Sequence, residues 1–132
     1  MRERMRPIVS TRNCRTRFPD RRPNQSNYTH TPEIYDEVEG IFPDGQYTLV
    51  ECDRQNNGGP SHIDIWKLKL DARGEYERLT FFGEYAGYKS SNPVVSDDGK
   101  FFAFQMGVSR SATGSIGRGI MVYDLEKARQ AK

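Results

Sequence analysis

Two polar segments carry the side chains best suited to binding or catalysis, and the first is the loop 53–62 (DRQNNGGPSH). Its candidate ligand-binding residues are Asp53, Arg54 and His62. The loop offers oxygen atoms of the kind that calcium prefers, but it lacks the Asp-x-Asp-x-Asn-Gly spacing and the closing glutamate of a calcium loop. We favour a solvated hairpin loop, because segments of this composition commonly join strands. We therefore expect no metal site.

The second polar segment, 81–89 (FFGEYAGYK), is rich in aromatic side chains. Tyr85, Tyr88 and Lys89 could form a platform for a sugar or a peptide, since aromatic rings offer a broad apolar contact surface. The alternative, which we favour, is that this segment packs as the connection between two structural units. Tyr85, Tyr88 and Lys89 stand as ligand-binding candidates beside that alternative.

Residues for catalysis are harder to find, and we assign none. His30 and His62 are the only histidines, and histidines without a spaced partner are more often polar surface groups than bases or metal ligands. No Gly-x-Ser-x-Gly motif presents a serine nucleophile. Cys14 and Cys52 lack metal-type spacing, and we do not expect them to form a disulfide. We predict no cofactor, and we favour a non-enzymatic role.

The charge of the chain is divided unevenly between its two parts. Residues 1–30 contain eight arginines and two acids, a net charge of +6, whereas residues 31–132 sum to −4. We therefore predict a basic, disordered leader over residues 1–32. Nucleic-acid binding is not expected, because the body is acidic and the leader has few aromatic residues for base stacking.

The distribution of apolar residues disfavours two further classes of protein, those with a secretory signal and those that span a membrane. The charged start, Met1–Arg6, has no apolar run behind it, so we expect no secretory signal. Nowhere does an apolar run approach the roughly 20 residues that cross a bilayer, so we expect no membrane span. Abundant aromatic residues (11%) with 12 Gly and 7 Pro instead favour short strands joined by tight turns.

An internal repeat organises the body of the chain. The segment 40–50 (GIFPDGQYTLV) matches the segment 94–104 (VVSDDGKFFAF), so that Gly45 and Gly99 lie 54 residues apart. In each, an acid followed by Gly predicts the turn of a hairpin, because Gly accepts a positive φ. A period near 50 with a turn and apolar strands in each unit is typical of a propeller blade.

A second block recurs at nearly the same spacing, since 64–71 (DIWKLKLD) aligns with 119–126 (GIMVYDLE) at an offset of 55. The predicted strands cover 38–42, 46–53, 62–70 and 76–82 in the first unit and 92–96, 100–106 and 119–125 in the second. The segment 108–118 is expected to be a Ser/Gly-rich loop. The sequence thus predicts an all-β fold of two antiparallel blades, one four-stranded and one three-stranded, spanning about 33–90 and 91–126 before a charged tail, 127–132.

These motifs resemble the repeat of TolB-like (WD40-like, PD40) β-propellers. The resemblance rests on the Pro-Asp-Gly and Asp-Asp-Gly-Lys turns at 43–45 and 97–100, Arg-Leu-Thr at 78–80 and Tyr-Asp-Leu at 123–125. It implies that the chain is an open, C-terminal two-blade fragment of a larger propeller. It also implies a periplasmic or extracytoplasmic location, although the sequence shows no signal peptide, so the compartment stays open.

Three functional hypotheses follow. The leading one is a non-catalytic module that binds a protein or a glycan through its loops and edges. The second is a part of a larger propeller hydrolase or lyase acting on a carbohydrate or peptide, and the third is a non-functional gene fragment. Because two blades alone leave apolar faces and strand edges uncovered, we also expect self-association.

Overall fold

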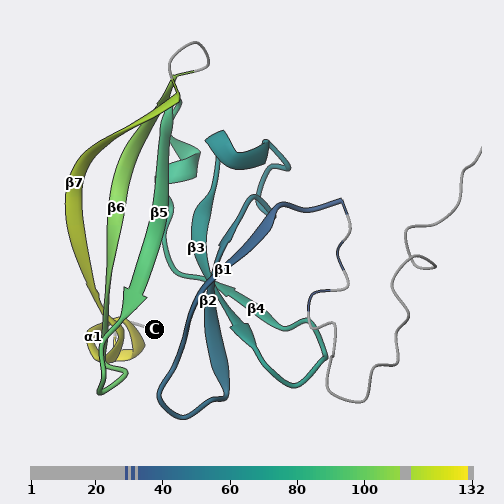
Figure 1. Cartoon of the computed structure of the whole chain (residues 1–132), viewed down its shortest axis with the longest axis vertical. Coiled ribbons are helices and arrows are strands. Elements are labelled where there is room, and N and C mark those ends of the chain that lie inside the picture. The colour runs from purple at the N-terminus through teal and green to yellow at the C-terminus, as the bar shows by residue number, and fades with distance from the viewer. Residues whose placement is uncertain (1–28, 30, 32, 111–113, 131–132) are drawn as a thin grey trace, which may run out of the picture.

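The computed structural model describes residues 29, 31, 33–110 and 114–130, and in them seven strands form two antiparallel sheets (Figure 1). The first sheet has the order β1-β2-β3-β4, and the second has the order β5-β6-β7. The strands are β1 (Asp36–Ile41), β2 (Tyr47–Cys52), β3 (Asp64–Lys69), β4 (Tyr76–Arg78), β5 (Tyr88–Val95), β6 (Phe101–Arg110) and β7 (Gly114–Asp124). Two short 3-10 helices, η2 (Gly59–Ser61) and η3 (Phe82–Glu84), and the helix α1 (Leu125–Gln130) complete the fold.

This arrangement confirms the predicted all-β fold of one four-stranded and one three-stranded blade-like sheet, which together do not close into a barrel or ring. Both predicted hairpin turns form. Gly45 and Gly99 have φ values of 68° and 69°, in the left-handed region that glycine enters without steric cost. The leader predicted for residues 1–32 lies outside the described residues, apart from 29 and 31.

The hairpin between β6 and β7 differs from its predicted form. Residues 108–118 were expected to be a loop, but β6 continues to Arg110 and β7 begins at Gly114. Val108 lies directly opposite Ile116, and cross-strand pairs of β-branched residues stabilise an antiparallel ladder. A register shift between Met106 and Gly107 accommodates one extra residue in β7.

The two sheets pack face to face around one main core. It joins Leu49 and Ile65 of the first sheet to Phe102 and Phe104 of the second, and all four side chains are at most 4% exposed. β5 is the strand of the second sheet that lies beside the first sheet, and β7 lies on the far side (Figure 1). Both faces of β2 are buried, which explains why apolar residues occupy both faces of this strand rather than alternating with polar ones.

The outer faces of the two sheets differ in how far they are covered. On the first sheet, Val50, Cys52 and Leu68 are buried beneath Ile34 and the rings of Trp66 and Tyr76. On the second sheet, three β-branched residues remain largely exposed: Val94 (67%), Ile120 (72%) and Val122 (68%). The second sheet therefore presents an uncovered apolar face.

Candidate functional site

The loop 53–62 is held together by Asp53, which is 2% exposed. One carboxylate oxygen accepts a hydrogen bond from the backbone N–H of Tyr35 at 3.0 Å, and the other accepts one from Gly59 at 2.7 Å. The carbonyl oxygen of Asp53 also accepts from the N–H groups of Asn56 and Asn57. With both carboxylate oxygens bonded to backbone, Asp53 organises the loop instead of facing a ligand.

Arg54 and His62, the other candidates in this loop, have separate partners. The Arg54 guanidinium carbon lies 3.9 Å from the centre of the Tyr76 ring, an attractive cation–π contact. Nδ1 of His62 lies 3.2 Å from both the Gly58 carbonyl oxygen and the Ser61 hydroxyl. Arg54 thus contacts β4 and His62 contacts the loop itself, so both side chains have partners within the chain, as in a structural connection.

The three residues considered for an aromatic platform, Tyr85, Tyr88 and Lys89, lie in different surroundings. Tyr88 and Lys89 belong to β5, and Lys89 Nζ donates to the carbonyl oxygen of Pro60 at 3.4 Å. Tyr85 follows η3 and is 66% exposed. Of these three candidates, only Tyr85 lines the groove described next.

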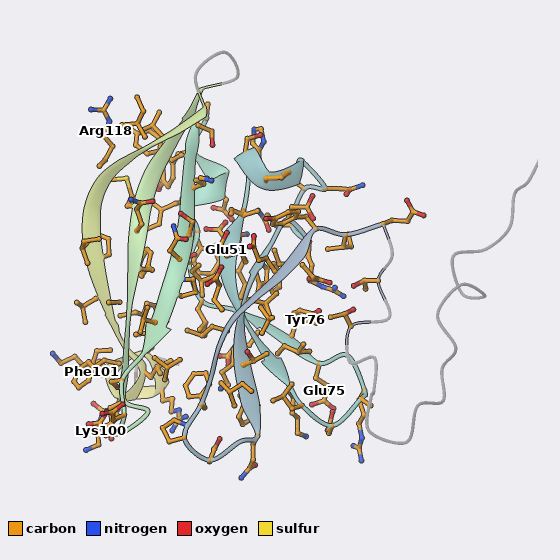
Figure 2. All side chains as sticks on the ribbon, in the orientation of Figure 1. Glu51, Glu75, Tyr76, Lys100, Phe101 and Arg118 are labelled. Carbon is orange, nitrogen blue, oxygen red and sulfur yellow. The ribbon has the colours of Figure 1, made fainter. Side chains whose placement is uncertain are left out.

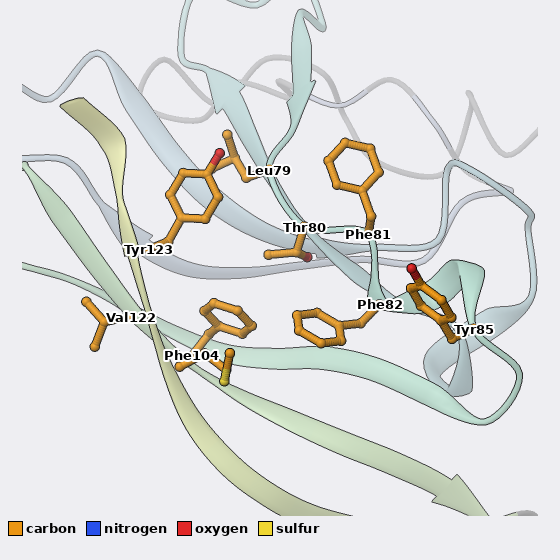
Figure 3. A pocket seen from close by; sticks show the side chains of 9 residues that line it. Leu79, Thr80, Phe81, Phe82, Tyr85, Phe104, Val122 and Tyr123 are labelled. Atoms are coloured by element: carbon orange, nitrogen blue, oxygen red, sulfur yellow. The ribbon is translucent and has the colours of Figure 1, made fainter. Parts of the chain in front are cut away.

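An apolar groove of about 410 Å³ lies between the segment that follows β4 and the strand β7 (Figure 3). Its lining is made of aromatic and aliphatic side chains with three hydroxyl groups, and it contains no carboxylate, imidazole, thiol or amine. The lining residues are Leu79, Thr80, Phe81, Phe82, Tyr85, Phe104, Met121, Val122 and Tyr123. Such a surface can bind apolar side chains but supplies no general acid or base near neutral pH.

The groove borders an open strand edge, since β7 pairs only with β6 among the described residues. The N–H of Leu125 donates to the Lys100 carbonyl oxygen at 2.9 Å, so the odd-numbered residues of this part of β7 are the ones that bond to β6. In an antiparallel ladder, residues that bond to one neighbour alternate with residues whose N–H and C=O groups point the other way. The backbone groups of Ile120 and Val122 therefore point away from β6, toward the open edge.

One residue that sequence reasoning missed fixes the position of the segment that lines the groove. Asp64, at the start of β3, is fully buried and accepts hydrogen bonds from Thr80 Oγ1 at 2.9 Å and from the Gly83 N–H at 3.1 Å. Arg78 completes the site with an ion pair. No spacing signal marks Asp64, because its partners follow 14 to 26 residues later in the chain.

Three acids gather between β1 and β2, where Glu37, Glu39 and Glu51 offer oxygen atoms within 4.8 Å of one another. Glu37 and Glu51 lie directly opposite each other in the ladder, and Figure 2 shows Glu51 in the interior of the molecule. Burial raises the pKa of Glu51 and of Glu39 above the usual range. The Asn92 N–H donates to Glu51, so this carboxylate has a structural partner.

No family model matches the chain, and no curated protein or solved structure is significantly similar to it. Within the described ranges, no helix is long and apolar enough to cross a membrane.

Proposed function

We propose that the chain is a non-catalytic protein-interaction module that binds an extended apolar segment along the edge of β7. The observation that carries this proposal is the position of the groove directly beside an unpaired strand edge. Extended peptides commonly bind by adding a strand to such an edge, where backbone hydrogen bonds give affinity and side-chain pockets give specificity.

The internal repeat supports the same position. In the first sheet, β4 pairs with β3 through Trp66 and Arg78. The repeat aligns Trp66 with Met121 of β7, yet the described residues contain no strand against β7. The place that β4 takes in the first sheet is thus open in the second, and a bound segment would take it.

The lining of the groove favours a protein over a glycan. An added strand directs alternate side chains to opposite faces of the sheet. One set enters the groove beside Phe82 and Phe104, whose rings lie 6.0 Å apart, and the other set meets Ile120 and Val122. Sugar recognition relies on precisely placed polar groups, and Thr80, one of the three hydroxyls here, already bonds to Asp64.

The family assignment belongs to the same proposal. The TolB-like resemblance is supported by the two Gly-containing hairpins and by the four- and three-stranded sheets at the repeat spacing. Blade-type modules of this kind present loops and edges to partners. The chain is accordingly proposed to act as a binding unit rather than as an enzyme.

A displayed library of nine-residue peptides with alternating apolar residues tests the function directly, beside a glycan array. We expect peptides to be selected and to bind about tenfold more weakly to Tyr85→Ala, since a truncated interface tyrosine commonly costs 1 kcal/mol or more. Tyr88→Ala is the matched control, an exposed tyrosine outside the groove, and should leave binding unchanged. Selection of glycans but no peptides would overturn the proposal.

A further inference from the structure

We infer that the segment bound along β7 is the β7 strand of a second copy of this chain, so that two chains join edge to edge about a two-fold axis. This inference rests on the proposed function, because it names the partner for the same edge. The observation that carries it is that β7 is complementary to itself in one antiparallel register, the one centred on Met121.

In this register Ile120 lies opposite Val122 of the second copy, and Val122 lies opposite the second Ile120. Both residues direct their backbone N–H and C=O groups toward the open edge, as the bond from Leu125 to Lys100 requires. The two chains would therefore exchange complete pairs of hydrogen bonds. The exposed β-branched side chains, 72% and 68% exposed in one copy, would cover one another across the strands.

The same register brings opposite charges together at both ends of the contact. Counted along β7, Arg118 comes level with Asp124 of the second copy, and the two-fold axis repeats this pair. Arg118 is the extra residue at the register shift in β7, so its side chain, and not ladder hydrogen bonds, makes the pair. Figure 2 shows Arg118 on the outer side of the second sheet. The backbone N–H of Lys127 donates to Asp124, and this hydrogen bond lowers the pKa of the carboxyl, so Asp124 is ionised at neutral pH.

The register also fits by size. Gly119 lies opposite Tyr123 of the second copy, and the space where a Cβ of Gly119 would stand has no atom within 4 Å. A tyrosine ring from the neighbouring strand can therefore approach without a clash at this position. Met121 lies opposite its own counterpart and faces the groove that it lines.

The resulting assembly is a continuous six-stranded sheet in which both open β7 edges are paired. Because the contact uses the same edge on both chains, it closes at two copies and cannot propagate into a fibre. A short edge contact of this kind is a small interface, so we expect a reversible dimer rather than a permanent one.

Sedimentation equilibrium of the full chain over a roughly thousandfold concentration range tests the inference. The wild type should fit a monomer–dimer equilibrium. Arg118→Glu places like charges opposite each other twice per dimer and should weaken it about tenfold, whereas Arg118→Glu with Asp124→Asn should recover much of the loss. Asparagine keeps the capping oxygen that Glu126 and Lys127 use, so α1 is preserved.

Val94→Lys is the matched control, because it places a charge on the same exposed face but on β5, away from the edge. It should leave the dimer intact. Dimers that Val94→Lys and Arg118→Glu weaken equally, or assemblies larger than two, would overturn edge pairing. A wild type that stays monomeric while library peptides still bind would overturn the self-pairing alone, and a failure of both would overturn the proposed function as well.

Discussion

Nη2 of Arg78 lies 2.7 Å from Oδ2 of Asp64, and this aspartate is fully buried. The same guanidinium donates to the carbonyl oxygen of Thr80 at 3.0 Å and to Glu84 at 2.9 Å. Asp64 also accepts a hydrogen bond from Ser90 of β5 at 3.3 Å. The pair therefore ties the first sheet to the segment that lines the groove and to the start of the second sheet.

Replacing Asp64 with Asn should cost about 3 kcal/mol of unfolding free energy, because it leaves the Arg78 guanidinium, whose side chain is only 14% exposed, without its main counter-charge. Urea denaturation measures this loss. Glu84→Gln removes the other acid that pairs with Arg78, but the Glu84 side chain is 57% exposed, so its loss should cost less than about 1 kcal/mol. Equal losses in the two variants would show that the burial of Asp64 is not what matters.

Replacing Glu51 with Gln should raise the unfolding free energy at pH 7. Burial raises the pKa of Glu51, so the folded state holds this proton more tightly than the unfolded state does. The stability that this group contributes is present below its unfolded pKa and is lost as the pH rises through its folded pKa. Glutamine avoids the like charge of Glu37 directly opposite and keeps an oxygen for the Asn92 N–H.

The advantage of Glu51→Gln should therefore be clear at pH 7 and small at pH 4, in urea titrations at both pH values. A variant that is less stable than the wild type by the same amount at both would contradict the account of the buried acid.

Proline substitutions distinguish the two sides of β7. In Val122→Pro the lost N–H points away from β6, and an open strand edge tolerates proline at such a position. The chain should therefore fold and lose only association and peptide binding. In Met121→Pro the lost N–H is one that pairs with β6, and the fold itself should be destabilised. Circular dichroism with sedimentation measures both properties. A folded, still dimeric Val122→Pro would contradict the role of this edge.

The sheets could be predicted from the sequence because their signals are local. Gly45 and Gly99 each follow an acid and lie in the turn just before a strand, and the recurrence of the surrounding residues indicates two units. The predicted lengths of β6 and β7 were wrong. The pairing of Val108 with Ile116 joins residues on either side of a segment whose composition is typical of a loop.

The candidate site was less predictable, since it depends on distant contacts. The sequence singled out Tyr85, which does line the groove, but it did not group it with Phe104 and Met121, which come from other strands. Asp53 was a ligand-binding candidate in a loop expected to be solvated, yet its carboxylate bonds to the backbone of Tyr35 from another part of the chain. Only the three-dimensional arrangement separates such structural acids from ligand-binding ones.

Amide hydrogen exchange along β7 tests the central claim, that its open edge is the binding surface. In dilute protein, the Met121 amide should exchange slowly because it bonds to β6, whereas the Val122 amide should exchange fast. At high protein concentration, or with a selected peptide, the Val122 amide should become protected to a similar degree. A Val122 amide that exchanges fast while peptide is bound or the protein is dimeric would contradict the account.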